Sequence, residues 1–122
     1  MNVFHLGHVI AERILFWEND EASMVLIRIG QLRAIDSEQE GTLYLCPYQI
    51  ENLGCFELPI EFRSGMDAID ALQNAFVAIG ATLREAQSQT GRRLCWGDRD
   101  NPTIGFPEEC IDSDILIENT SE

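Results

Sequence analysis

The sequence predicts an α+β domain: an antiparallel β-sheet of four to five strands with one long α-helix packed across a face, followed by an acidic C-terminal segment. Residues 1–62 show the apolar alternation and β-branched density that are typical of strands. Residues 63–90 carry apolar residues at helical spacing, and the chain after Gly97 is rich in turns and acids. We expect residues 1–107 to form a single α+β domain and residues 108–122 to form an acidic extension.

Two alternating segments begin the predicted sheet. Residues 8–17 and 22–32 each place apolar side chains on both faces, and the polar residues 18–21 between them favour a hairpin turn. The polar stretch 36–41 then leads to a third strand at residues 42–50. These patterns predict three antiparallel strands in succession.

The fourth strand is predicted at residues 55–62, and residues 94–96 form a short strand or extended segment. Pro47 and Pro59 lie inside the third and fourth strands. Because proline cannot donate a ladder hydrogen bond, each marks an edge, a bulge or a strand end. We therefore expect these two strands to be the less regular pair.

The long helix is predicted to begin at Ser64 as N-cap, with Asp67 three residues later in a capping-box position, and to end at Gly91. Six apolar residues recur at spacings of three and four, so they share one helix face. This stripe is expected to face the sheet, and it consists of Ile69, Leu72, Phe76, Ile79, Leu83 and Ala86.

The chain is strongly acidic. Its 122 residues hold 21 Asp and Glu against 8 basic residues, all of them Arg, for a formal net charge of −13 at pH 7. Nucleic-acid binders gain most of their affinity by neutralising phosphates, so this charge argues against that class. No apolar run approaches the roughly 18 residues of a membrane span, and residues 1–8 do not resemble a signal peptide. We expect a cytoplasmic protein with neither nucleic-acid nor membrane partners, and with reduced thiols at Cys46, Cys55, Cys95 and Cys110.

The sequence contains no local catalytic motif. The histidines, His5 and His8, lie at the N-terminal end of the first strand, and in an extended chain they point to opposite faces, which disfavours a shared metal with Glu12. The cysteines lack the short spacing of zinc sites, and residues 98–109 have Thr103 where a calcium loop needs glycine. We expect no catalytic residue, no metal and no cofactor.

Small-ligand binding is one alternative. In that hypothesis the chain is a ligand-binding domain or an enzyme with a cleft between helix and sheet. Tyr48, Trp96 and Asp67, together with arginines, would line this cleft.

Short motifs in a fixed order carry a resemblance to a known family. They are Cys46-Pro47-Tyr48-Gln49-Ile50 with Leu53-Gly54, Gly65-Met66-Asp67-Ala68 at the helix entry, Leu94-x-Trp96, and Gly105-Phe106-Pro107. From about Arg13 to Pro107 the chain resembles a family of small bacterial domains of unknown function. The resemblance implies a fold and carries no catalytic residues. The motifs themselves indicate structural roles, such as a fixed turn at residues 105–107.

The acidic charge is concentrated near the C-terminus. Residues 98–122 hold eight acids against Arg99, a balance of −7, with apolar residues among them. One interpretation is a solvated tail that aids solubility. The other is a docking segment in which apolar anchors bind and acids steer a basic partner. Its predicted partner-binding residues are Asp98, Asp100, Glu108, Glu109, Asp112, Asp114, Ile115 and Ile117.

The leading hypothesis is a non-catalytic immunity or inhibitor protein that neutralises a basic toxin or effector. Basic surfaces are common on nucleases and related enzymes, and an acidic domain complements them. The alternative is a general interaction module, or a homodimer that assembles through an exposed third or fourth strand. The first hypothesis predicts association that weakens with salt, and the second predicts a salt-insensitive oligomer.

Overall fold

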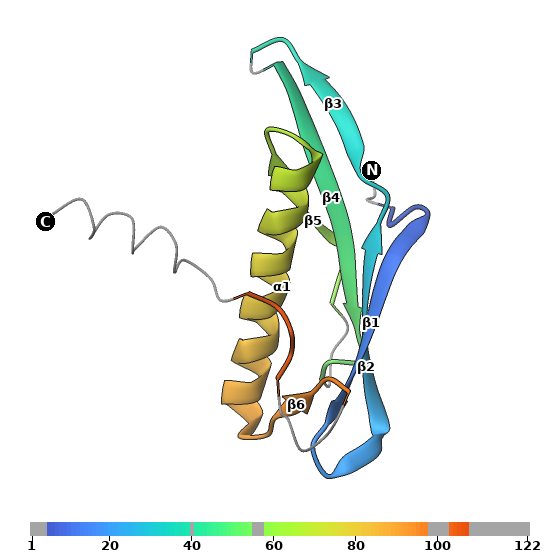
Figure 1. Ribbon diagram of the computed structural model, residues 1–122, viewed down its shortest axis with the longest axis vertical. Coiled ribbons are helices and arrows are strands. Elements are labelled where there is room, and N and C mark those ends of the chain that lie inside the picture. The colour runs from blue at the N-terminus through green and yellow to red at the C-terminus, as the bar shows by residue number, and fades with distance from the viewer. Residues whose placement is uncertain (1–4, 40, 55–57, 98–102, 108–122) are drawn as a thin grey trace, which may run out of the picture.

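The computed structural model describes residues 5–39, 41–54, 58–97 and 103–107. The elements are, in chain order, β1 (Val9–Trp17), β2 (Asp20–Gly30), β3 (Arg33–Ser37), β4 (Gly41–Glu51), β5 (Glu61–Gly65), α1 (Ala68–Thr90) and β6 (Leu94–Cys95). The six strands form one antiparallel sheet, and α1 lies along one side of it (Figure 1). The predicted α+β fold class is confirmed.

β4 is the central strand and pairs along both of its edges. On one edge Tyr48 lies opposite Ile29 of β2, and Leu45 lies opposite Arg33 of β3. On the other edge Tyr48 lies opposite Glu61 of β5. β2 and β3 therefore follow one another along the same edge of β4, while β1 pairs with the far edge of β2 and β6 with the end of β1. The expectation that the third strand exposes an edge is wrong, because β4 is paired on both sides.

The ladder on the β2–β3 side of β4 is interrupted next to Pro47. Between the Ile29–Tyr48 pair and the Arg33–Leu45 pair, the β2–β3 side advances four residues and β4 advances three. Proline has no amide hydrogen to donate, so an interior strand accommodates it where the ladder is broken. Pro47 therefore lies inside β4, opposite the gap between β2 and β3, and not at an end of the strand.

Two other strands differ from the prediction. No strand was predicted at residues 33–37, and Asp36 and Ser37 were expected in a polar connection, but these residues form β3. They do so because the long β4 offers them an antiparallel partner, and an antiparallel strand tolerates polar side chains on its solvated face. The fourth strand was expected at residues 55–62, but β5 begins at Glu61, after Pro59. Residues 55–57 lie outside the described part of the chain.

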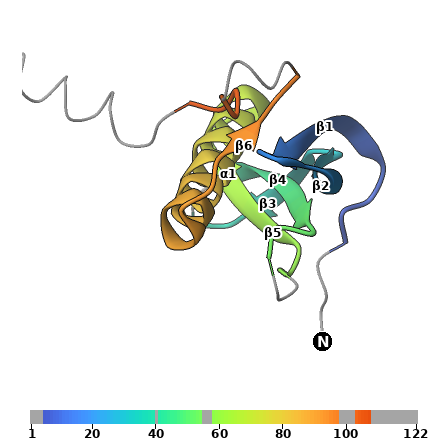
Figure 2. The same cartoon turned by 90° about the horizontal axis from the view of Figure 1, so that it is seen from below.

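The core lies between α1 and one face of the sheet. Leu15 and Trp17 of β1, Ile27 of β2 and Tyr48 of β4 are buried there against Ile79 of the helix. Figure 2, which views the fold along the helix, shows α1 on one side of the sheet. Within the described residues no helix or strand covers the opposite side of the sheet. We call this opposite side the open sheet face, although Leu6 lies over it at Gly30, next to the buried Pro47.

The start of α1 and its buried stripe differ from the prediction. Asp67, and not Ser64, is the N-cap: its Oδ1 accepts a hydrogen bond from the Asp70 amide at 2.7 Å. Ser64 belongs to β5, so the strand extends into the predicted cap. The predicted end at Gly91 is confirmed, since Gly91 adopts the left-handed conformation of a C-cap.

A line of small residues on α1 faces the sheet. The buried residues are Ala71, Ala75, Ile79, Gly80 and Leu83. Leu72 and Phe76 are half-buried at the side of this line, and Ile69 is 66% exposed. The predicted stripe is therefore rotated, because alanine lets the helix backbone approach the sheet more closely than a line of large residues would.

Candidate protein-binding surface

The open sheet face carries an apolar surface on the β1–β2 hairpin. Directly opposed pairs place Ile14 beside Leu26 and Phe16 beside Met24 on this face. Ile14 and Met24 are 43% and 48% exposed, whereas Leu15 and Val25, which follow them in the chain, are fully buried on the other face. On other strands Ile35 and Phe62 are also exposed, and their partners in β4 place them on the same face.

An ion triad joins three strands across this apolar surface. Arg28 of β2 lies between Glu12 of β1 and Glu51 of β4, with nitrogen–oxygen distances of 3.1 and 2.8 Å to their Oε2 atoms. The hydrogen bond to Glu12 raises the pKa of the Arg28 guanidinium above its usual value, and burial opposes this shift. The triad carries one net negative charge, because two carboxylates share one cation.

The triad and the apolar residues line one open depression. It has a volume of about 400 Å³ and is lined by Glu12, Ile14, Ala22, Met24, Leu26, Arg28, Glu51 and Asn52. The carboxylates are the more exposed members of the triad, at 49% and 43% of their side-chain area, whereas Arg28 is 27% exposed. The depression therefore presents acceptor oxygens next to aliphatic side chains.

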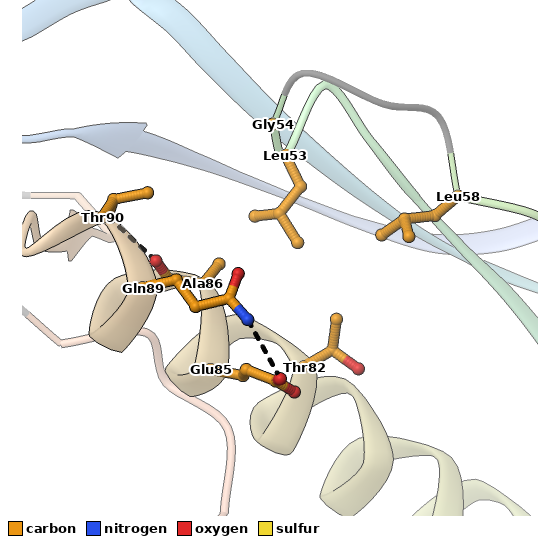
Figure 3. Close-up of a pocket in the computed structure, with 8 residues that line it drawn as sticks. All are labelled: Leu53, Gly54, Leu58, Thr82, Glu85, Ala86, Gln89 and Thr90. Atoms are coloured by element: carbon orange, nitrogen blue, oxygen red, sulfur yellow. Dashed lines mark hydrogen bonds between the residues drawn. The ribbon is translucent and has the colours of Figure 1, made fainter.

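A second hollow lies between the C-terminal half of α1 and the residues that follow β4 (Figure 3). Its volume is about 350 Å³, and Leu53, Leu58 and Ala86 supply apolar walls. Gln89 Nε2 donates to Glu85 Oε2 at 3.2 Å, and Thr90 Oγ1 donates to the Ala86 carbonyl at 2.8 Å. These polar groups bond within the helix, so the hollow offers mainly apolar contact.

Two arginines hold the chain after β6 against the domain. Arg13 Nη1 donates to the Gly105 carbonyl at 2.8 Å, and the Arg13 guanidinium stacks over the rings of Trp96 and Phe106 at 3.7 and 4.9 Å. Such stacking adds cation–π attraction to the hydrogen bond. Arg84 donates to the carbonyls of Phe106 and Pro107 at 2.7 and 3.0 Å. We call these contacts the arginine clasp.

Two glycines allow the clasp to close. Gly105 has a φ of +76°, and a Cβ there would lie 2.5 Å from the Trp96 ring. A Cβ on Gly80 of α1 would lie 2.7 Å from the Pro107 carbonyl oxygen. The Gly105-Phe106-Pro107 motif and Trp96 therefore have a structural role: they fasten the end of the described chain to β1 and α1.

The residues proposed for a ligand cleft have separate surroundings. Tyr48 is buried in the core, and its hydroxyl donates to Glu61 Oε1 at 3.3 Å. Asp67 caps the start of α1, and Trp96 stacks on Arg13. None of the three lines either hollow described above, nor the smaller one of about 130 Å³ between the sheet and Phe106.

The predicted docking segment lies outside the described residues. This holds for all eight of its proposed binding residues, Asp98, Asp100, Glu108, Glu109, Asp112, Asp114, Ile115 and Ile117. Of the four cysteines, Cys46 and Cys95 are described, and both are buried without a disulfide bond. Cys55 and Cys110 lie outside the described residues.

Two general features bear on cofactors and membranes. In residues 5–39, 41–54, 58–97 and 103–107, no group of three His, Cys, Asp or Glu side chains is placed to hold a metal ion. The helix described there is not apolar enough to cross a membrane.

Fold and surface together define a small α+β domain in which no described helix or strand covers one sheet face, and in which residues 105–107 are held by two arginines. Residues 11–108 match the family described as Domain of unknown function (DUF6968), and the chain belongs to this family. The match extends from β1 through the sheet and α1 to the clasp, which confirms the resemblance identified from the motifs. No curated protein and no solved structure matches the chain.

Proposed function

We propose that this chain is a small acidic protein-binding domain without catalytic activity, and that it inhibits a basic protein, as an immunity protein neutralises a toxin. The observation that carries the proposal is how the fold uses its arginines. In the described part of the chain, six of the seven arginines engage groups of the chain itself. The fold therefore offers a partner more negative than positive charge.

The arginine contacts are of two kinds. Arg13 and Arg84 donate to backbone carbonyls of residues 105–107, and Arg33 donates to the backbone carbonyl of His5. Arg28 forms ion pairs with two carboxylates, those of Glu12 and Glu51. Counted over the described ranges, the sequence holds seven Arg against eleven Asp and Glu, a balance of −4, and the remaining −9 belongs to the other residues. A surface with this balance attracts basic proteins over long distances at low ionic strength.

The state of the nucleophiles supports a non-catalytic role. Burial raises the pKa of the Cys46 thiol to about 11, so this thiol is protonated at neutral pH. Cys95 is also buried, and His5 and His8 are exposed ahead of β1.

Capture of a partner and a functional assay test the proposal. Tagged full-length chain is incubated with lysate of its native cell at low and at high salt, and bound proteins are identified by mass spectrometry. A matched chain ending at Pro107 removes the acidic extension and retains the arginine clasp. The captured partner is then purified, and its own activity is measured as the chain is titrated in.

We expect a basic partner, bound stoichiometrically, that is released by salt and loses activity when the chain is added. A weaker complex with the chain ending at Pro107 would assign part of the binding to the acidic extension. A complex that forms equally at both salt concentrations, or a partner that remains fully active in the complex, would contradict the inhibitor proposal. Self-association without another partner would contradict it as well.

A further inference from the structure

We propose that the basic partner docks on the open sheet face, with a Lys or Arg side chain bound at Glu12 and Glu51 and with apolar residues packed on Ile14 and Met24. This inference rests on the proposed function and specifies its binding surface. The occupant of the open depression is thus an amphipathic basic segment of the partner.

The exposed apolar side chains of the hairpin make this face a docking surface. Ile14 and Met24 lie on neighbouring strands and on the same face, and each exposes more than two fifths of its area. Contiguous apolar area of this kind, bordered by polar groups, is typical of protein-binding sites. The other face of the sheet is filled by the core against α1, so it cannot receive a partner.

The negative charge of the open sheet face favours a positively charged group of the partner. Arg28 contacts the Oε2 atoms of Glu12 and Glu51, and each carboxylate keeps a second oxygen with its own lone pairs. An incoming ammonium or guanidinium group therefore gains charge-assisted hydrogen bonds while Arg28 stays in place. Because Arg28 already holds both carboxylates, little side-chain freedom is lost when the cation binds.

A second copy of this chain fits the face less well. Two open faces brought together would oppose two triads, each with one net negative charge, and two chains that each carry a formal charge of −13. Like charges placed face to face oppose association. A basic segment supplies the missing charge and also covers the apolar residues, so charge complementarity favours it.

The test uses the isotope-labelled full-length chain and short synthetic peptides as probes. The first peptide alternates Leu and Arg; in the second, citrulline replaces Arg and removes the charge; in the third, Ser replaces Leu and removes the apolar side chains. Amide shifts in NMR spectra locate each peptide, and their concentration dependence gives its affinity. Circular dichroism checks that every variant is folded.

We expect the Leu–Arg peptide to shift amides of β1, β2 and β4 that surround Arg28, and to bind more tightly than the other two peptides. The double variant Glu12→Gln and Glu51→Gln should weaken its binding roughly ten-fold or more, as expected for lost hydrogen bonds between charged groups. The charge-matched control, Glu38→Gln with Glu85→Gln, alters exposed carboxylates elsewhere and should leave the affinity unchanged. Met24→Ser removes an exposed contact and should weaken binding without unfolding the domain.

Several results would overturn the inference. Shifts confined to α1 or to the acidic extension would place the basic segment elsewhere, and equal losses in the two double variants would show attraction to net charge alone. A dimer that forms without peptide and dissociates in Met24→Ser would assign the face to a second copy. An absence of binding by the Leu–Arg peptide would also overturn it.

The proposed function can fail separately. If a captured partner is inhibited equally by wild-type chain and by the double variant Glu12→Gln and Glu51→Gln, the inhibitor function stands and the docking surface is wrong. If the peptide binds the open face but no partner is inhibited, the surface is right and the function is wrong.

Discussion

At the scale of single residues, burial controls the protonation of two groups on β4. Tyr48 is buried in the core, and burial raises its pKa to about 12, because the phenolate would lose its hydration. Burial also raises the pKa of the neighbouring Cys46 thiol, to about 11. Both groups therefore remain neutral in the folded protein over a wider pH range than in the unfolded chain.

Alkaline pH should destabilise the fold through Tyr48. An unfolded tyrosine ionises near pH 10, whereas Tyr48 keeps its proton up to about pH 12 when folded. The contribution of protonated Tyr48 to the free energy of unfolding is thus complete below pH 10 and is lost as the pH rises through 12. By about pH 11 the free energy of unfolding should fall by about 1 kcal/mol from this group. Urea unfolding between about pH 9 and pH 11 measures the fall.

Tyr48→Phe is the control for this prediction. Phenylalanine cannot ionise, so the variant should lose less stability than the wild type over the same pH interval, while Cys46 contributes equally to both. The variant also lacks the hydrogen bond to Glu61, which lowers its stability at every pH below 10 by about 1 kcal/mol. Parallel losses in the two proteins would show that Tyr48 does not titrate in this interval.

At the scale of elements, the packing of α1 is decided by its small residues. Ala71 and Ala75 are completely buried, and Gly65 at the end of β5 lies against the first turn of the helix. A Cβ on Gly65 would lie 2.3 Å from the Ala71 nitrogen, so an alanine there would push strand and helix apart. The close approach of β5 and α1 thus depends on residues that contribute little apolar area themselves.

Two isoleucines of α1 test which side of the helix is buried. Ile79 is fully buried, and Ile69 is 66% exposed. Ile79→Ala should lower the free energy of unfolding by about 3 kcal/mol, because it leaves a cavity in the core. Ile69→Ala removes the same atoms from an exposed site and should cost less than about 0.5 kcal/mol. Urea titrations of both variants compare them, and similar costs would contradict the orientation of the helix.

At the scale of the whole molecule, the arginine clasp joins the residues after β6 to β1 and α1. Arg13 and Arg84 hold residues 104–107, and the Phe106 ring contacts the Phe76 ring at 5.9 Å. Ile104 is buried as well. The clasp thus fixes residues that follow β6 against both the sheet and the helix.

Truncation measures what the clasp contributes. A chain ending at Pro107 should unfold at about the temperature of the full-length chain, because the clasp is intact. A chain ending at residue 102 loses Ile104 and Phe106 and leaves Arg13 and Arg84 without these carbonyls. It should be less stable by about 2 kcal/mol or more. Equal thermal unfolding of the two truncated chains would show that residues 103–107 do not stabilise the domain.

The sequence determined the fold class, the β1–β2 hairpin and the long helix, but not β3 or the start of β5. Side chains alternate between the two faces along β1. This alternation predicts Leu15 and Trp17 on one face and Glu12 and Ile14 on the other, and the structure has this arrangement. The helix and its end at Gly91 also follow from local spacing and from a glycine in the left-handed conformation. Such features depend on residues a few positions apart, so periodicity and turn chemistry are sufficient to predict them.

The tertiary structure decided which faces meet and which distant charges pair. Periodicity finds the large residues of α1, but the fit against the sheet selects Ala71 and Ala75 for the interface. The triad around Arg28 depends on the register of three strands, and the Arg13 contact to Ile104 spans 91 positions. Patterns over a few neighbouring residues do not predict contacts between residues so far apart in the sequence. They arise only when the folded chain brings its strands, its helix and its C-terminal turn into contact.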